Sequence, residues 1–212
     1  MPLPVSAAYL SLALQDGAKV GSETLVHRGL GDLLLPSGQL LACDPFLVSR
    51  ESTAFNLSLP SGPFPVVLAI AEIPTDERVA FATIRLNKAT PISWEMLTTG
   101  SHDVSTLQAG HIFGYPVDSG TGCFMDPAAA KALEQTMRDE NEFFKFLIEE
   151  MKKNYRPTWD WLNMRFGAGN LIAFSSGYGD GVYATYAGRD EKNSLVAVVT
   201  DFEVIPSENY PD

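Results

Sequence analysis

The clearest pattern in the chain is a pair of apolar, β-favouring runs on either side of a polar turn. Residues 64–73 (FPVVLAIAEI) and 78–86 (RVAFATIRL) are rich in Val, Ile, Phe and Ala. Residues 74–77 (PTDE) separate them and combine Pro with Asp, which favour a turn. The pattern predicts an antiparallel hairpin over residues 64–86.

The first fifth of the chain also reads as extended structure. We expect a strand or a partner segment over residues 5–14 and a strand over residues 24–28. Two apolar runs flank the turn residues Pro36-Ser37-Gly38, which predicts a second hairpin over residues 31–43. Asp44-Pro45 should end it, because proline has no N–H to donate to a neighbouring strand.

A helix is predicted to begin at Asp126-Pro127. Asp is a good N-cap, and proline at the first helical position loses no hydrogen bond. Apolar residues then recur at four-residue spacing at Phe143, Leu147 and Met151. We expect an amphipathic helical region, with a possible break near Asp139 and an end at residues 152–154 (KKN), before Pro157.

The remaining apolar runs predict strands over residues 112–117, 123–125, 170–175, 182–186 and 195–205. The run 123–125 is expected to continue the strand before it, after a Gly-rich turn. Trp159-Asp-Trp161 is expected to form an aromatic edge over the packing of helix on sheet. The fold class is α+β: an antiparallel β-rich sheet, sandwich or partial barrel with one or two amphipathic helices packed on it. Without internal repeats or a long linker, residues 1–212 are expected to form a single domain.

Charge and apolar content narrow the expected partners. The formal net charge of −11 repels phosphate groups, so neither nucleic acid nor an anionic membrane is expected as a partner. An unknown protein partner is possible, because an acidic surface can steer association. No apolar run reaches the ~20 residues needed to span a bilayer, and the N-terminus lacks the basic region of a signal peptide.

Cys43 and Cys123 are the cysteines of the chain, and neither has the spacing of a zinc motif. We expect two reduced, mostly buried thiols and a cytoplasmic location, with pairing as the alternative if the two Cα atoms meet. Cys123 with His111 and Asp118 would be the candidate set for nucleophilic catalysis. A thiol beside Phe124 and Met125 is more typical of a core.

Two short motifs bring Asp and Gly together. Residues 117–121 (VDSGT) are similar to the turn that holds a catalytic carboxylate in aspartic proteases, but a second copy is missing. A β-turn in which Asp118 binds local amides is the preferred interpretation. Residues 177–181 (GYGDG) precede strand sequence rather than a helix, so a turn with positive φ is favoured over a phosphate loop.

Several carboxylates fall at predicted turns and could converge on a divalent cation: Asp118, Asp126, Asp180, Asp190 and Asp201. None has the spacing of an EF-hand, and Asp126 is already explained as a helix cap. Solvated turns are therefore preferred, and neither a metal nor a cofactor is expected.

Four strings together resemble a mostly bacterial family known as domain of unknown function 4241. They are GQLLACDP (38–45), YPVDSGTGCFMD (115–126), SSGYGDGVYATYAG (175–188) and VVTDF (198–202). The similarity spans almost the whole chain, and the family has no assigned activity to carry over. The resemblance implies where a site would lie. Its recurring motifs are the Asp44-Pro45 turn, the Asp118 to Gly122 turn, the Gly177 to Gly181 loop and Asp201, and these turns are expected to lie together at one end of the sheet.

Two classes of function follow. The first is a non-enzymatic binding or interaction protein, accessory or immunity-like, because no complete set of acid, base and nucleophile is visible. The alternative is a metal-dependent or carboxylate-based hydrolase with its site at the Asp- and Gly-rich turns. Its candidate catalytic residues are Asp118, Asp180 and Asp201. The candidate ligand-binding residues are Asp44, Ser119, Gly120, Gly177, Gly179 and Gly181.

Overall fold

A computed structural model describes residues 6–48, 52–100, 102–108, 110–136 and 140–207. The helical elements are α1 (Ala7–Ser11), η1 (Leu12–Leu14), η2 (Val104–Thr106), α2 (Pro127–Thr136) and α3 (Glu140–Lys152). The strands are β1 (Lys19–Val20), β2 (Glu23–Leu35), β3 (Leu41–Cys43), β4 (Gly62–Ile73), β5 (Asp76–Arg85), β6 (Ser93–Met96), β7 (Tyr115–Val117), β8 (Thr121–Met125), β9 (Trp161–Phe166), β10 (Gly169–Ser175), β11 (Gly181–Tyr183), β12 (Thr185–Arg189) and β13 (Leu195–Asp201). Among the described residues, no helix has the length and apolar character needed to cross a membrane.

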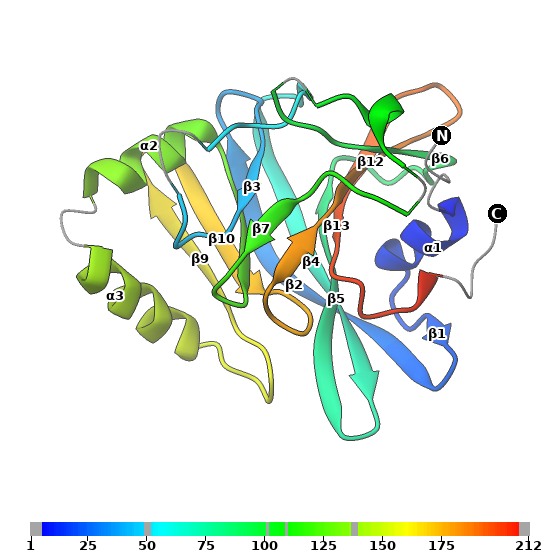
Figure 1. Cartoon of the computed structure of the whole chain (residues 1–212), viewed down its shortest axis with the longest axis horizontal. Coiled ribbons are helices and arrows are strands. Elements are labelled where there is room, and N and C mark those ends of the chain that lie inside the picture. Colours follow the sequence, from blue (N-terminus) through cyan, green and yellow to red (C-terminus); the bar gives the residue numbers. More distant parts are fainter. Residues whose placement is uncertain (1–5, 49–51, 101, 109, 137–139, 208–212) are drawn as a thin grey trace.

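The strands form antiparallel sheets that together curl into a half-barrel (Figure 1). The largest sheet has seven strands in the order β1-β2-β4-β5-β13-β12-β6. A second sheet has four strands in the order β3-β8-β10-β9, and β11 pairs with β7 in a short ribbon. The α+β, β-rich class predicted from the sequence is therefore confirmed.

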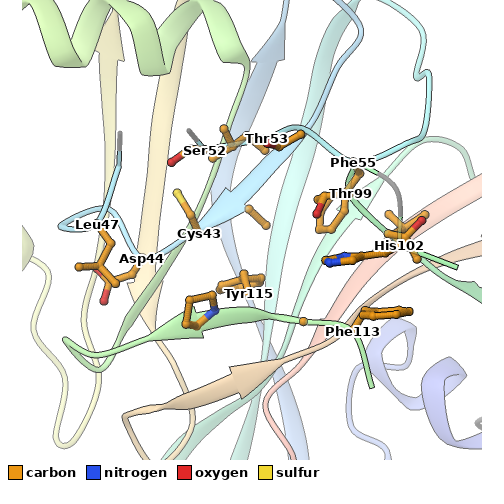
Figure 2. Close-up of a pocket in the computed structure, with 16 residues that line it drawn as sticks. Cys43, Asp44, Leu47, Ser52, Thr53, Phe55, Thr99, His102, Phe113 and Tyr115 are labelled. Atoms are coloured by element: carbon orange, nitrogen blue, oxygen red, sulfur yellow. The ribbon is translucent and has the colours of Figure 1, made fainter. Parts of the chain in front are cut away.

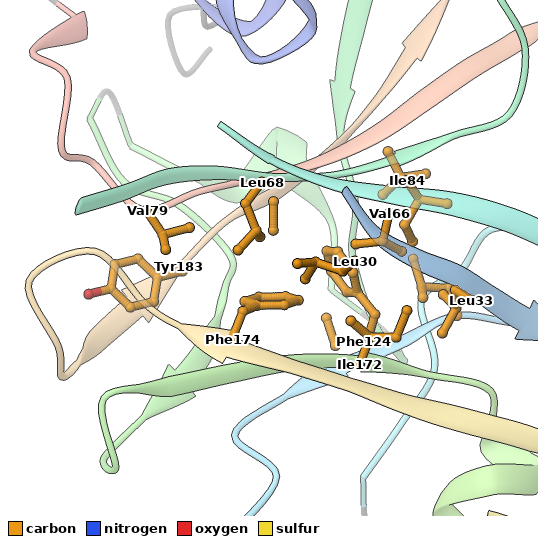
Figure 3. Close-up of a cluster of buried hydrophobic side chains, with 14 of the residues drawn as sticks. Leu30, Leu33, Val66, Leu68, Val79, Ile84, Phe124, Ile172, Phe174 and Tyr183 are labelled. Atoms are coloured by element: carbon orange, nitrogen blue, oxygen red, sulfur yellow. The ribbon is translucent and has the colours of Figure 1, made fainter. Parts of the chain in front are cut away.

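The main core fills the space between the two large sheets (Figure 3). Leu68 on β4 and Ile84 on β5 face Phe124 on β8 and Phe174 on β10, and all four are fully buried. The rings of Phe124 and Phe174 meet edge to face, with centroids 5.1 Å apart. Burial of such side chains contributes about 1.5–3 kcal/mol each, so this layer fixes the two sheets against one another.

Helices cover the outer faces of the sheets (Figure 1). Leu133 of α2 and Leu147 and Met151 of α3 are buried in a cluster with residues of the four-stranded sheet such as Leu171. On the far face of the seven-stranded sheet, Tyr9 of α1 packs edge to face on Phe81 of β5. The predicted amphipathic helical region thus packs on the sheet as expected.

A buried asparagine ties the two sheets together where β2 bends. Asn170 on β10 is 2% exposed, and its Nδ2 donates to the carbonyl oxygen of Asp32 over 2.8 Å. Its Oδ1 accepts from the backbone N–H of Leu34 over 2.7 Å. Asn163 on β9 adds a hydrogen bond to the carbonyl oxygen of Leu30, at 3.0 Å. These bonds satisfy backbone groups of β2 beyond Thr24, where β1 no longer pairs with it.

Two predictions made from local patterns are confirmed. The hairpin of residues 64–86 corresponds to β4 and β5, which pair from Ile73 with Asp76 to Val66 with Ile84. Asp126 caps α2, because its Oδ1 accepts from the N–H of Ala128 over 2.8 Å. The expected break near Asp139 falls between α2 and α3, where residues 137–139 lie outside the described part of the chain.

The predicted hairpin of residues 31–43 is wrong. The turn at residues 36–38 forms, but it connects two different sheets: β2 pairs with β4, and β3 pairs with β8. Likewise residues 123–125 do not continue the strand before them, since β7 pairs with β11 while β8 pairs with β3 and β10. Local turn residues indicate that the chain reverses, but the partner of each strand is set by distant segments.

The N-terminal segment and the last third also differ from prediction. Residues 7–14 are helical, because Tyr9, Leu10 and Ala13 bury their side chains on the seven-stranded sheet at helical spacing. Residues 182–186 divide between β11 and β12, and the last strand ends at Asp201 rather than residue 205. The predictions also miss β1, β6 and β9, and they treat the start of β9 as an aromatic edge.

Candidate functional site

Asp44, which directly follows β3, is the first of the predicted site residues and is fully buried. Its Oδ1 accepts from the N–H of Phe46 over 2.9 Å. Its Oδ2 accepts from the N–H groups of Asp118 and Ser119, at 3.0 and 2.9 Å. These charge-assisted bonds offset the cost of burying a carboxylate. Asp44 therefore ties the end of β3 to the turn between β7 and β8.

The same turn is tied to the glycine-rich loop on its other side. The Oδ1 of Asp180 accepts from the N–H of Gly120 over 3.0 Å, and the N–H of Ser176 donates to the carbonyl oxygen of Gly120, also over 3.0 Å. The structure thus brings Asp44, the turn of residues 118–120 and the loop of residues 177–181 together, as the resemblance implied. At this junction of Asp44, the turn and the loop, the carboxylates of Asp44 and Asp180 accept hydrogen bonds from backbone amides of the turn.

The glycine-rich loop is a tight turn with positive φ. Gly177 has a φ of 52°, and a Cβ there would lie 2.9 Å from the carbonyl oxygen of Phe202. The N–H of Gly179 donates to the carbonyl oxygen of Ser176 over 2.7 Å, and the hydroxyl of Tyr183 donates to the carbonyl oxygen of Gly179 over 2.8 Å. Strand β11 follows this loop, which agrees with the turn favoured over a phosphate loop.

Asp201 belongs to a different environment. The residue is 8% exposed, and its Oδ1 accepts from the hydroxyl of Tyr9 on α1, at 3.0 Å, and from the N–H of Glu203, at 2.8 Å. Burial, with a smaller contribution from the nearby Glu203 carboxylate, raises the pKa of Asp201 to about 7. Asp201 therefore faces the N-terminal helix.

The three candidate catalytic carboxylates thus have different partners. Asp118 and Asp180 have exposed side chains, Asp180 binds the backbone, and Asp201 binds Tyr9. Within the part of the chain that the structure describes, no three His, Cys, Asp or Glu side chains gather closely enough to hold a metal ion.

A pocket of about 310 Å³ lies beside the Asp44 turn (Figure 2). One wall is β3 with Asp44, and the opposite wall is the segment that leads into β7. The lining residues that the sequence reasoning missed include Phe55, Leu97, Thr99, His102 and Phe113. No local motif marks them, because they come from loops far apart in the sequence and meet only in the fold.

The pocket combines apolar walls with polar side chains. Phe55 and Leu97 are buried apolar side chains, while Thr99 and His102 contribute a hydroxyl and an imidazole. The rings of His102 and Phe113 stack with centroids 4.4 Å apart and an interplanar angle of 4°. Among its described lining residues there is neither Lys nor Arg.

Cys43, which lines this pocket, meets the second cysteine, Cys123. Cys43 on β3 and Cys123 on β8 are direct cross-strand partners, and their Sγ atoms lie 3.6 Å apart. Both are free thiols; Cys43 is partly exposed and Cys123 is fully buried. Burial and the adjacent Cys43 raise the pKa of Cys123 well above its usual value. Cys123 is therefore a core thiol, in agreement with the preferred interpretation over a nucleophile paired with His111.

Comparison with known proteins gives a family but no function. Neither the curated proteins nor the solved structures contain a match to this chain. The family model described as "Protein of unknown function (DUF4241)" matches residues 33–200, a span that includes the Asp44 turn, the glycine-rich loop and both cysteines. The chain therefore belongs to the DUF4241 family.

Proposed function

We propose that this protein is a non-enzymatic binding protein whose pocket beside β3 receives a small, uncharged organic ligand. The observation that carries the proposal is the pocket itself. Its volume of about 310 Å³ falls at the lower end of the range for small-molecule sites, which bury most of a ligand between apolar walls and a few polar groups.

The lining indicates what kind of molecule fits. Apolar side chains such as Leu41 and Leu97 supply contact area, and the hydroxyls of Thr98 and Thr99 can orient a neutral polar group. The stacked rings of His102 and Phe113 present a flat surface against which a planar ligand can pack. A carboxylate or phosphate would find no cation among the described lining residues and would be repelled by the net charge of −11.

The buried junction beside the pocket supports a binding role rather than a chemical one. Asp44 lines the pocket, yet both its oxygens already accept hydrogen bonds from backbone amides. It therefore holds the wall in place instead of acting as a free base. The alternative, a hydrolase built on Asp118, Asp180 and Asp201, has no comparable observation in its favour.

Fragment binding tests the proposal directly. The probes are neutral aromatic alcohols and amides, each with a matched carboxylate and phosphate, followed through the backbone amide signals in NMR spectra. We expect the neutral probes to bind with a dissociation constant of about 1 mM or lower and to shift signals of pocket residues. Thr99→Trp fills the pocket and should abolish these shifts. Thr90→Trp places the same side chain at an exposed threonine outside the pocket and should leave them intact.

Three results would overturn the proposal. Shifts that persist in Thr99→Trp would place binding elsewhere on the molecule. Stronger binding of the carboxylates or phosphates would contradict an uncharged ligand. Conversion of an amide or phosphate probe during the measurement, lost on substitution of Asp118 or Asp180, would favour the hydrolase instead.

A further inference from the structure

We propose that Cys43 and Cys123 form an oxidation site, in which a hydroperoxide that enters the pocket converts the two thiols into an intramolecular disulfide between β3 and β8. Cys43 belongs to the wall of the proposed binding pocket and contacts Cys123. Oxidation of the two thiols does not depend on which ligand the pocket holds.

The backbone already places the two cysteines for bonding. Cys43 and Cys123 are opposite one another in the antiparallel pairing of β3 with β8. Directly opposed residues of antiparallel strands have Cα atoms about 4.5–5.5 Å apart, within the range that a disulfide spans. The Sγ atoms lie 3.6 Å apart, so they must approach by about 1.5 Å to reach the ~2.05 Å of an S–S bond. A small rotation of the side chains achieves this without moving either strand.

The two thiols differ in access, which sets the order of reaction. Cys43 is partly exposed and its sulfur lies at the pocket wall, as Figure 2 shows. Cys123 is 0% exposed and lies beneath the helices in the cluster that includes Leu133 and Leu147. A raised pKa, caused first by burial, also keeps Cys123 protonated and slow to attack a peroxide. The peroxide therefore meets Cys43 first.

The chemistry balances with one peroxide. The Cys43 thiolate attacks a peroxide oxygen, so an S–O bond forms, the O–O bond breaks, and the departing oxygen is protonated to water or an alcohol. Cys43 is then a sulfenic acid. The sulfur of Cys123 attacks it, the S–S bond forms and the S–O bond breaks. The leaving hydroxide takes the proton of Cys123 as water, and the peroxide has accepted the two electrons that the thiols lost.

Oxidation would change the pocket that the proposed ligand enters. The bond uses the thiol of Cys43, which lines the pocket, and fixes β3 covalently to β8. The bond also protects Cys43, because a sulfenic acid with a thiol neighbour condenses before a second peroxide can oxidise it further.

The test uses the full chain, reduced and then treated with hydrogen peroxide. After unfolding and alkylation with N-ethylmaleimide, intact mass spectrometry should show a monomer that has lost two hydrogen atoms and gained no alkyl group. Peptide mapping should recover a peptide that joins Cys43 to Cys123. Oxygen atoms added without loss of both thiols, or a disulfide that links two chains, would refute the proposal.

The matched variants Cys43→Ser and Cys123→Ser test the order of reaction. Cys123→Ser keeps the accessible thiol and should accumulate a sulfenic acid that dimedone traps. Cys43→Ser keeps the buried thiol, which should react with peroxide at least about tenfold more slowly. Equal reactivity would overturn entry through the pocket. If a variant does not fold, alkylation of the native wild type with iodoacetamide decides the same point, since labelling of Cys43 alone is expected and labelling of Cys123 would contradict it.

Discussion

The carboxylate of Asp201 makes the stability of this fold depend on pH. The residue is 8% exposed at the end of β13, and the hydrogen bonds to its carboxylate come from the hydroxyl of Tyr9 and the N–H of Glu203. Burial raises its pKa from an ordinary 3.8 to about 7. Replacement by asparagine keeps the shape of the side chain and an oxygen that accepts both hydrogen bonds, but removes the charge.

The size of the effect follows from the shift in pKa. A difference of about 3 units corresponds to about 4 kcal/mol between the two ends of the titration, at about 1.4 kcal/mol per unit. Because the folded pKa lies above the unfolded one, the folded state binds more protons between these values. The free energy of unfolding contributed by Asp201 is therefore fully present below about pH 4 and is lost as pH rises towards about pH 7.

Urea denaturation followed by tryptophan fluorescence measures this difference. Wild type and Asp201→Asn are compared at about pH 5 and about pH 8, since other carboxylates affect both proteins alike and cancel in the comparison. At the higher pH the variant should be more stable by about 1–3 kcal/mol, which is the charge penalty less the cost of burying an amide NH₂. Towards the lower pH this advantage should shrink or reverse.

The refuting result is a stability difference between the two proteins that does not change with pH. It would mean that Asp201 titrates near its ordinary pKa and that burial does not penalise its charge. Tyr9→Phe serves as a second check, because the hydroxyl stabilises the charged form of Asp201. Its removal should move the titration to higher pH and cost about 1–3 kcal/mol.

Two further substitutions test the junction beside the pocket. Gly177→Ala should destabilise the fold by about 2–4 kcal/mol, because φ is positive and the added Cβ would lie 2.9 Å from the carbonyl oxygen of Phe202; an unchanged melting temperature would contradict the close approach. Asp44→Asn should cost about 2–4 kcal/mol and speed hydrogen exchange at the amides of Asp118 and Ser119, because the carboxylate that accepts from both is lost. Unaltered exchange would mean that Asp44 does not brace the turn.

The features that sequence reasoning predicted correctly are those whose partners are close in the chain. The turn between β4 and β5 and the cap that Asp126 gives to α2 each depend on residues a few positions apart. The hairpin of residues 31–43 failed because β2 pairs with β4 over eleven residue pairs, a partner that lies beyond the turn and outside any local window. Residues 7–14 failed because a short apolar run fits a strand or a helix equally well, and only contact with β5 selects the helix.

Local patterns reach the same limit at the candidate site, where they identify Asp residues at turns but not their roles. The sequence marks Asp44, Asp180 and Asp201 by their turns, but an Asp that braces a loop and an Asp that binds a ligand have the same local pattern. The difference lies in distant partners: the amides of residues 118 and 119 for Asp44, and Tyr9 for Asp201. Much of the pocket, by contrast, comes from loops with no motif, such as those of Phe55, Thr99 and His102, and local patterns do not reveal these loops.

The bracing turns and the pocket are nevertheless linked, because Asp44 belongs to both. Its carboxylate holds the turn of residues 118–119, while the residue itself forms part of the pocket wall next to Cys43. Loss of the Asp44 carboxylate should therefore weaken binding by loosening the turn, even where the ligand does not touch that carboxylate. Such a variant cannot by itself identify Asp44 as a ligand-binding residue.

Comparison with Thr99→Trp separates the two roles, since Thr99 lines the pocket from the other side and is not a partner of the Asp44 carboxylate. Lost fragment binding with unchanged stability in Thr99→Trp, beside lost stability in Asp44→Asn, would place recognition in the pocket and support in the turn.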